Sequence, residues 1–264
     1  MSQKSRLVQI LEWLKVQQEI SLEEMMNQFT ISRDTARRDL VKLEQQGEIV
    51  RIKGGAILSS HGSQVVQYRR REITGAKEKI AQKACTYIHD HDYLLLDTST
   101  TVELTAQYIT GKGITVVTNS IDIVNTLSEQ VEITVYLTGG KFNPFQRNFV
   151  GCHTVEELRK YKVDTLFIGA CGIGEEGLTS PDEEEAFVKK SMIQAARKVI
   201  VLADYTKFEK EFFHKVCGLE DVDVIITDQE PPEKVKQKIE EQQIELVLIH
   251  HVTQEEMRDE NEKN

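Results

Sequence analysis

Apolar residues near the start of the chain recur at the spacing of α-helices. A first helix is predicted around residues 7–14, where apolar side chains at i, i+3, i+4 and i+7 share one face. A second, short helix is predicted over residues 22–29, because Ser21 and Glu24 form the capping-box pattern directly before it. The apolar faces of these two helices consist of Leu7, Ile10, Leu11, Leu14, Leu22, Met25, Met26 and Phe29.

A third helix is predicted from Ser32, which can cap it, to about residue 46. Its inward face carries Ala36, Leu40 and Leu43, spaced by four and three residues. Arginines dominate the opposite face near the helix N-terminus. This pattern suits entry into the major groove of DNA, because arginine reads guanine or clamps phosphate while threonine contacts base edges or the backbone. The predicted DNA contacts of this helix are Ser32, Arg33, Thr35, Arg37 and Arg38.

Two short β-strands are predicted after the third helix, over residues 48–52 and 56–58. They are joined through the segment Lys53-Gly54-Gly55 and form a β-ribbon wing with basic residues near its tip. We predict further DNA contacts by Arg51 and Lys53. Two short helices, an arginine-rich third helix and a glycine-tipped ribbon predict a winged helix-turn-helix DNA-binding domain over residues 1–57.

The distribution of charge separates this segment from the rest of the chain. The whole chain has 264 residues and a net charge of −10, from 33 lysines and arginines against 43 aspartates and glutamates. Residues 1–57 hold nine of the basic and eight of the acidic residues, so the remainder carries the negative charge. Length and charge together predict two domains. Residues 58–75, which include Arg69-Arg70-Arg71, are predicted as a linker, and residues 253–264 as an acidic, flexible tail.

Helix and strand patterns alternate over residues 76–252. Short β-branched runs that alternate with helices predict an α/β domain whose mostly parallel sheet is covered by helices on both faces. Predicted helices cover residues 76–89, 101–109, 121–128, 154–161, 183–197, 219–222 and 233–242. Predicted strands cover residues 93–97, 114–118, 132–137, 163–168, 198–203, 224–227 and 245–249.

Small polar residues gather where the predicted strands end. The segment Asp97-Thr98-Ser99-Thr100-Thr101 follows one strand and opens a helix, so that hydroxyls and free backbone amides favour a phosphate or another anion there. Residues 118–120, 138–141, 169–172 and 203–208 hold comparable positions. Because ligands bind at the carboxyl edge of such sheets, these segments predict a pocket for a polar, anionic small molecule. Lys207 is its predicted cation, with Lys141 or Arg147 as further candidates.

Composition restricts the class of protein further. The longest strongly apolar runs, such as Val199–Ala203, are far shorter than the ~20 residues of a membrane span, and the first residues lack an apolar signal core. The four cysteines form no C-x-x-C pair. We therefore expect a cytoplasmic protein with reduced thiols, no metal site and no cofactor.

The N-terminal motif resembles the DeoR family of bacterial transcriptional regulators. The motif is Ile31-Ser32-x-x-Thr35-x-Arg37-Arg38-Asp39-Leu40-x-x-Leu43, followed by Gly47 and by Gly54-Gly55-Ala56. The resemblance implies that Thr35, Arg37 and Arg38 contact DNA and that Asp39 helps to hold the helix.

The second domain resembles the sensor domain of the same family, whose fold is similar to those of ribose-5-phosphate isomerase and acyl-CoA transferases. The matching segments are Asp97–Thr101, Thr118-Asn119-Ser120, Gly139-Gly140, Gly177-Leu178-Thr179, Glu185-Ala186-x-x-Lys189 and Asp204-x-x-Lys207-Phe208. The resemblance implies that a phosphorylated sugar contacts Asp97, Thr100, Thr101, Asn119, Glu185 and Lys207. We add Ser99, Gly139 and Gly140, which belong to the same strand-end segments.

Two positions depart from the family pattern. Ser99 stands where the family has glycine, and we expect it to tighten or reshape the loop. Cys171 stands where an aspartate is common before Gly-Ile.

These observations predict a repressor of a carbohydrate-use operon that binds double-stranded operator DNA as a homodimer or homotetramer. A phosphorylated sugar or polyol would release it. One alternative is a constitutive DNA-binding protein whose α/β domain only oligomerises. Another is a sugar-phosphate isomerase-like enzyme in which Glu185 and Lys207 act as base and electrophile. The strand-end clusters argue against the first alternative, and Cys171 together with the attached DNA-binding domain argues against the second.

Overall fold

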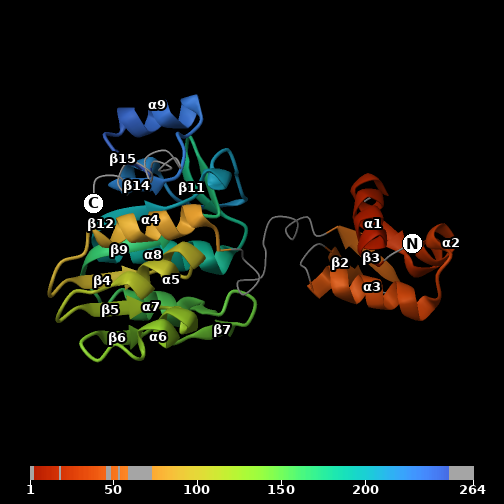
Figure 1. The fold of residues 1–264 in the computed structure, drawn as a ribbon, viewed down its shortest axis with the longest axis horizontal. Helices are drawn as coiled ribbons and strands as arrows, with labels where there is room; N and C mark the ends of the chain where they lie inside the picture. Colours follow the sequence, from red (N-terminus) through yellow and green to blue (C-terminus); the bar gives the residue numbers. More distant parts are fainter. Residues whose placement is uncertain (1–2, 18, 46–48, 53, 59–72, 250–264) are drawn as a thin grey trace, which may run out of the picture. The chain divides into compact units, whose positions relative to one another are not determined.

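Figure 1 shows the fold of the chain, a computed structural model that describes residues 3–17, 19–45, 49–52, 54–58 and 73–249. Contacts within the chain divide it into two compact units, Met1–Arg71 and Glu72–Asn264. Most of the predicted linker and all of the predicted tail lie outside the described residues. The first unit has one hydrophobic core and the second has two, one on each face of its sheet.

Three helices enclose the core of the first unit: α1 (Gln3–Gln17), α2 (Leu22–Phe29) and α3 (Arg33–Gln45). The predicted capping box starts α2, since Ser21 Oγ accepts a hydrogen bond from the Glu24 N–H at 3.1 Å and the Ser21 N–H donates to Glu24 at 2.7 Å. The core contains the stripes expected from the periodicity of the first and third helices. Its buried members include Leu7, Ile10, Leu14, Met25, Ala36, Leu40 and Leu43.

A three-stranded antiparallel sheet completes the first unit, with the order β1 (Glu19–Ser21), β3 (Gly55–Leu58), β2 (Ile49–Ile52). The β2–β3 ribbon confirms the predicted wing, whereas β1 was not predicted. Pairing with β1 explains the glycine at the start of β3. A Cβ atom at Gly55 would lie 2.1 Å from the Ile20 carbonyl oxygen, so a larger residue could not pair so closely.

Seven parallel strands form the centre of the second unit, in the order β15-β14-β12-β9-β4-β5-β6. This arrangement confirms the predicted α/β fold. In chain order the strands are β4 (Tyr93–Leu96), β5 (Thr115–Thr118), β6 (Thr134–Leu137), β9 (Val163–Gly169), β12 (Ala196–Leu202), β14 (Val224–Thr227) and β15 (Glu245–Leu248).

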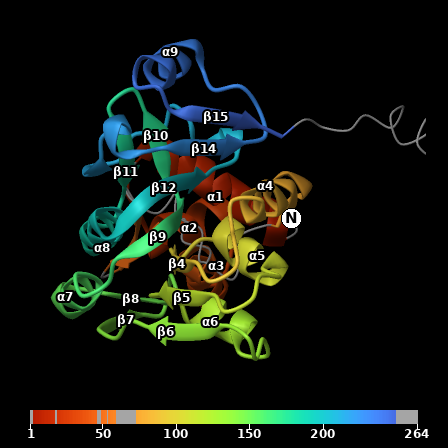
Figure 2. The same cartoon turned by 90° about the vertical axis from the view of Figure 1, so that its left-hand side faces the viewer.

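Helices cover both faces of this sheet, as Figure 2 shows. Side chains alternate along the strands, so the sheet contributes residues to both cores. Leu94 and Leu96 face one layer of helices, and Leu95 faces the other. The first layer is α4 (Gly75–Cys85), α5 (Thr100–Tyr108) and α6 (Ile121–Leu127). The second layer is α7 (Cys152–Leu158), α8 (Glu183–Ala195) and α9 (Glu233–Glu241).

Several short elements were not predicted. A hairpin joins β7 (Lys141–Asn143) to β8 (Asn148–Val150). A small antiparallel sheet contains β10 (Gly172–Gly174), β11 (Gly177–Ser180) and β13 (His214–Cys217). The helix predicted over residues 219–222 is a single 3₁₀ turn, η3 (Leu219–Asp221).

The chain reverses its path across the large sheet at β4. It continues to β5 and β6 on one side, whereas β9, β12, β14 and β15 follow on the other side. The carboxyl ends of β4 and β9 therefore form the topological switch point, where open α/β sheets bind ligands. Asp97 directly follows β4, and Gly169 ends β9.

Candidate DNA-binding face and effector site

The exposed face of α3 carries the arginines that the sequence assigns to DNA. Arg33, Arg37 and Arg38 are exposed, while Ala36 and Leu40 on the opposite face are buried. Burial of this apolar face fixes the rotation of α3 about its axis. The three guanidinium groups are therefore presented together on one surface, as contacts with phosphates and base edges require.

Ser32 and Thr35 organise the first turn of α3. Ser32 Oγ accepts a hydrogen bond from the Thr35 N–H at 3.3 Å and lies 2.9 Å from Thr35 Oγ1. The hydroxyl of Ser32 thus caps the helix, as predicted. The N-terminal turn of a recognition helix is the part that meets the bases, so this cap shapes the predicted contact surface.

Asp39 anchors α3 to α1. Its side chain is fully buried, and its two carboxylate oxygens accept hydrogen bonds from Arg6 Nε at 2.6 Å and from Gln3 Nε2 at 3.0 Å. Arg6 Nη2 makes a further contact with the carboxylate at 3.3 Å. This geometry agrees with the holding role that the resemblance implied for Asp39.

The wing is described only in part. Arg51 lies in β2, and Lys53 lies outside the described residues. Gly54 is exposed at the tip with a φ of +96°, a conformation that glycine adopts without strain. The tip thus shows the turn that the paired glycines predict.

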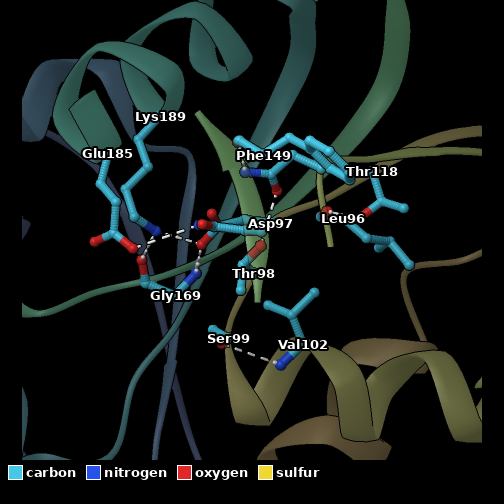
Figure 3. A network of polar contacts seen from close by, with 12 residues as sticks. Leu96, Asp97, Thr98, Ser99, Val102, Thr118, Phe149, Gly169, Glu185 and Lys189 are labelled. Atoms are coloured by element: carbon cyan, nitrogen blue, oxygen red, sulfur yellow. Dashed lines mark hydrogen bonds and ion pairs between the residues drawn. The ribbon is translucent and has the colours of Figure 1, made fainter. Parts of the chain in front are cut away.

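Asp97 is the centre of a buried polar network at the switch point of the large sheet (Figure 3). Asp97 follows β4 in the same alternation as Leu95, so its side chain points toward α8. Its carboxylate accepts a hydrogen bond from the Gly169 N–H at 3.1 Å and forms an ion pair with Lys189. Lys189 Nζ also donates to the Gly169 carbonyl at 2.9 Å. One ion pair therefore ties β4, β9 and α8 together.

Lys189 keeps its positive charge in this environment. Burial disfavours the ammonium form, but charge interactions with Asp97, Cys171 and Glu185 outweigh it, so the pKa of Lys189 lies above its ordinary value. Because the pKa is raised in the folded state, the interaction stabilises the fold at neutral pH. That stability is lost only as the pH rises through the raised pKa.

Asn119 connects the ends of β4 and β5 to the β7–β8 hairpin. Its Oδ1 accepts a hydrogen bond from Thr98 Oγ1 at 2.9 Å, and its Nδ2 donates to the Phe149 carbonyl at 3.0 Å. Thr118, one residue earlier, donates its hydroxyl to the Leu96 carbonyl at 2.7 Å. Asn119 is buried and holds the strand ends in place, although an amide can still make further hydrogen bonds.

Glu185 lies in the first turn of α8, beside the ion pair. Asp182 caps this helix by accepting a hydrogen bond from the Glu185 N–H at 2.8 Å. The Glu185 carboxylate is buried and accepts a hydrogen bond from Asn148 Nδ2 at 3.4 Å. Because Glu185 and Lys189 are four residues apart on one helix, they share the face that meets Asp97 (Figure 3).

Ser99 fits its position without the glycine of the family pattern. Its φ of −155° is extended backbone, and its Oγ accepts a hydrogen bond from the Val102 N–H at 3.2 Å, which caps α5. Thr100 and Thr101 begin that helix. The adjacent Gly169 accommodates the serine, since a Cβ atom at Gly169 would lie 2.4 Å from Ser99 Cβ. Ser99 and Gly169 are therefore in close contact where β4 and β9 end.

The other predicted contacts lie at the same edge of the sheet. Gly139 and Gly140 follow β6, and Gly140 has a φ of +138°. The Gly139 carbonyl accepts a hydrogen bond from Thr154 Oγ1 at 2.7 Å. Lys207 ends the 3₁₀ helix η2 (Tyr205–Lys207), which follows β12, and it is partly exposed.

Two further cations that the sequence offers to an anion have carboxylate partners. Lys141 Nζ lies 2.7 Å from Glu184, and Arg147 Nε lies 2.7 Å from Asp122. The first pair places the start of β7 beside the N-terminal turn of α8. The second pair fixes the β7–β8 turn against α6. Both side chains therefore already have a role within the fold.

The structure adds two residues to the site that the sequence did not select. Lys189 belongs to the Glu185-x-x-x-Lys189 motif, and its spacing of one helical turn was the available signal. Asn148 had no signal, because its hairpin was not predicted.

Among the described residues, no three or more histidine, cysteine, aspartate or glutamate side chains lie together in a group that could hold a metal ion. Among the described helices, none is both long and apolar enough to cross a membrane.

Comparison with known families accounts for both units. Residues 6–61 match the DeoR-like helix-turn-helix domain, and residues 72–229 match the DeoR C-terminal sensor domain. The chain belongs to the DeoR family. Its N-terminal unit is therefore the DNA-binding domain of a transcriptional regulator, and its α/β unit is a DeoR-type sensor domain.

Relatives of this DeoR-family chain match it over almost its whole length. The HTH-type transcriptional repressor GlcR of Bacillus subtilis (strain 168) is 40% identical over 94% of this chain and 97% of its own. The glycerol-3-phosphate regulon repressor of Escherichia coli (strain K12) is 31% identical over 94% of this chain and 100% of its own. Among solved structures, ribose 5-phosphate isomerase A of Methanocaldococcus jannaschii is 20% identical, with a TM-score of 0.36 over 50% of this chain and 53% of its own.

Proposed function

We propose that this protein represses an operon for the use of a carbohydrate or polyol, and that a phosphorylated sugar or polyol releases it from DNA. The observation that carries the proposal is the buried Asp97–Lys189 ion pair at the switch point of a DeoR-type sensor domain. The names of its relatives, a repressor called GlcR and a glycerol-3-phosphate regulon repressor, support the operon class.

The chemistry of the sheet edge supports a ligand that has both a phosphate and hydroxyls. The N-terminus of α5 offers backbone amides to an anion, and Lys207 offers a positive charge. Glu185 and Asp97 are acceptors that suit the hydroxyls of a sugar or polyol. The proposed effector contacts are Asp97, Ser99, Thr100, Thr101, Asn119, Gly139, Gly140, Glu185 and Lys207.

Control of DNA binding follows from linkage between the two units. An effector that binds better to the conformation with low operator affinity lowers that affinity, and the operator weakens effector binding by the same factor. We further propose a homodimer or homotetramer, because recognition helices that read adjacent half-sites must be spaced by ~34–36 Å, one helical turn of DNA.

The test is a thermal-shift screen combined with an operator-binding assay. The panel is glycerol 3-phosphate, ribose 5-phosphate and glucose 6-phosphate, each beside its unphosphorylated parent and inorganic phosphate. A ligand at 100 times its Kd stabilises the folded state by ~2.7 kcal/mol, which a thermal shift detects. We expect one ester to raise the Tm, its parent to have no effect, and the same ester to weaken binding to an operator selected from a random duplex library.

Absence of a thermal shift with every ester, while operator binding stays intact, would contradict the proposed effector class and favour the constitutive DNA-binding alternative. We also propose that the protein catalyses no reaction. Incubation with ribose 5-phosphate is expected to leave the ester unchanged, and formation of a ketose phosphate would instead support the isomerase alternative.

A further inference from the structure

Asn148 carries a buried hydrogen-bond acceptor that has no partner. The residue is only 2% exposed, and its Oδ1 makes no hydrogen bond in the structure. Within the part of the chain that the structure describes, only one other buried side-chain atom, Thr227 Oγ1, shares this property. Buried polar atoms without a partner destabilise the folded state, so such an atom inside a polar network indicates a missing partner.

The neighbouring carboxylate decides which way the Asn148 amide faces. Nδ2 donates to Glu185 Oε1 at 3.4 Å. Turning the amide over would place Oδ1 against the carboxylate, and two acceptors with no donor between them repel each other. Oδ1 is therefore the atom that lacks a partner, and the partner it needs is a hydrogen-bond donor.

The backbone holds Asn148 at the effector site. Asn148 starts β8 and forms a β-bridge with Ser120. On the next residue, the Phe149 N–H donates to the Asn119 carbonyl at 2.9 Å, and the Phe149 carbonyl accepts from Asn119 Nδ2 at 3.0 Å. Figure 3 shows Phe149 and Glu185 in the polar network that surrounds Asp97. Asn148 is thus fixed between the carboxyl end of β5 and the N-terminal turn of α8.

We propose that Asn148 is an effector-contacting residue whose Oδ1 accepts a hydrogen bond from a hydroxyl of the phosphorylated sugar or polyol. This inference rests on the proposed function and deepens it. A phosphate group carries acceptor oxygens at neutral pH, so it cannot satisfy Oδ1, whereas each hydroxyl of a sugar or polyol is a donor. The effector therefore directs a hydroxyl toward Asn148 and Glu185, and its phosphate lies away from them, toward the N-terminus of α5.

This arrangement gives Asn148 a role in specificity. A site whose buried polar atom pairs only with a bound hydroxyl discriminates strongly against an analogue that lacks it, because the atom is then left unpaired. A deoxy analogue that lacks the contacting hydroxyl would leave Asn148 Oδ1 without a hydrogen-bond partner.

The experiment measures the affinity of the full chain for each ester of the panel and for its monodeoxy analogues. The variants are Asn148→Ala and Asn148→Leu, with Thr227→Val as the matched control. Thr227→Val removes the other unpartnered buried atom, which lies at the end of β14 and is separated from β4 by β12 and β9. Operator binding without ester and the Tm without ester check that each variant is folded.

We expect both Asn148 variants to lose about tenfold or more in affinity for the ester that wild type binds, a loss of about 1.4 kcal/mol or more. Thr227→Val should keep the wild-type affinity. Wild type should also bind one monodeoxy analogue about tenfold more weakly than the parent ester, and the Asn148→Ala variant should no longer distinguish the two.

Two results would overturn the inference while leaving the proposed function intact. One is wild-type ester affinity in Asn148→Ala. The other is an Asn148→Ala variant that still binds the monodeoxy analogue more weakly than the parent ester by the same factor as wild type. If no ester of the panel binds wild type, the proposed function itself fails, and the assignment of Asn148 fails with it.

Discussion

Asp39 illustrates, at the scale of one residue, how a buried charge positions an exposed one. Its carboxylate is fully buried against Arg6 and Gln3, and the exposed Arg37 and Arg38 directly precede it in α3. A buried carboxylate is tolerated only with such partners. The family resemblance already implied that Asp39 helps to hold the helix, and the structure shows how, since its carboxylate faces inward toward Arg6 and Gln3.

Removal of one member of this pair should destabilise the N-terminal unit. We expect Asp39→Ala to lower its free energy of unfolding by ~3–5 kcal/mol, because Arg6 is then left buried without its carboxylate. Urea denaturation followed by Trp13 fluorescence reports on this unit, since Trp13 is the only tryptophan of the chain. Asp34→Ala, at an exposed position of the same helix, is the control. Equal stability of the two variants would contradict the role assigned to Asp39.

The arginines of α3 should contribute directly to operator affinity. We expect Arg37→Ala and Arg38→Ala each to lower it by ~1–3 kcal/mol if the side chain reads a base. Fluorescence anisotropy with a labelled operator measures the loss. Arg159→Ala removes an arginine of similar exposure from the sensor unit and should bind as wild type does. Unchanged affinity in both α3 variants would refute the assignment of the recognition helix.

At the scale of elements, the junction of β4, β9 and α5 depends on one matched pair of small residues. Ser99 caps α5 and also fills the space that a side chain at position 169 would need. The sequence around either residue gives no reason for the residue type at the other position. The serine departs from the family glycine, and the glycine that accommodates it is 70 positions later in the chain.

Substitution at this junction should therefore show coupling. We expect Gly169→Ala to destabilise the sensor unit by ~1–3 kcal/mol, because the new Cβ would lie 2.4 Å from Ser99 Cβ. Ser99→Gly should restore part of that loss in the double variant, whereas two independent sites would give additive effects. The measurement is urea denaturation of wild type, the two single variants and the double variant. Gly139→Ala, which meets no atom within 4 Å, is the tolerated control.

At the scale of the whole molecule, an acidic protein binds an acidic polymer. The net charge is −10, yet the arginines of α3 share one exposed face. Binding then depends on a local surface and on release of counterions from DNA, not on net attraction.

Operator affinity should consequently fall steeply with salt. We expect a slope of about −0.9 in log K against log [salt] for each phosphate contact. A variant that loses a phosphate-contacting arginine should have a slope smaller by about one, while a base-reading arginine changes affinity with a smaller effect on the slope. Titrations at 50–200 mM salt with wild type and the two α3 variants separate these roles. A flat response in wild type would exclude the electrostatic contribution.

The sequence by itself determined the helices, the wing and the alternation of strands with helices. Periodicity, caps and turn residues are local properties, and residues a few positions apart specify them. Ser21 with Glu24 and the stripe Ala36, Leu40 and Leu43 are examples that the structure confirms. The motifs also sufficed to identify the family.

Only the tertiary structure decided which strand ends meet. Strand order places Asp97 beside Gly169 and Lys189, which are far apart in sequence, and long-range pairing of strands sets that order. The strands β7 and β8 have three residues each, which is too few to show an alternating pattern of apolar and polar residues. The sequence therefore did not predict the hairpin or the position of Asn148. The sequence thus shows which types of residue form the polar site, whereas the order of the strands in the fold brings those residues together.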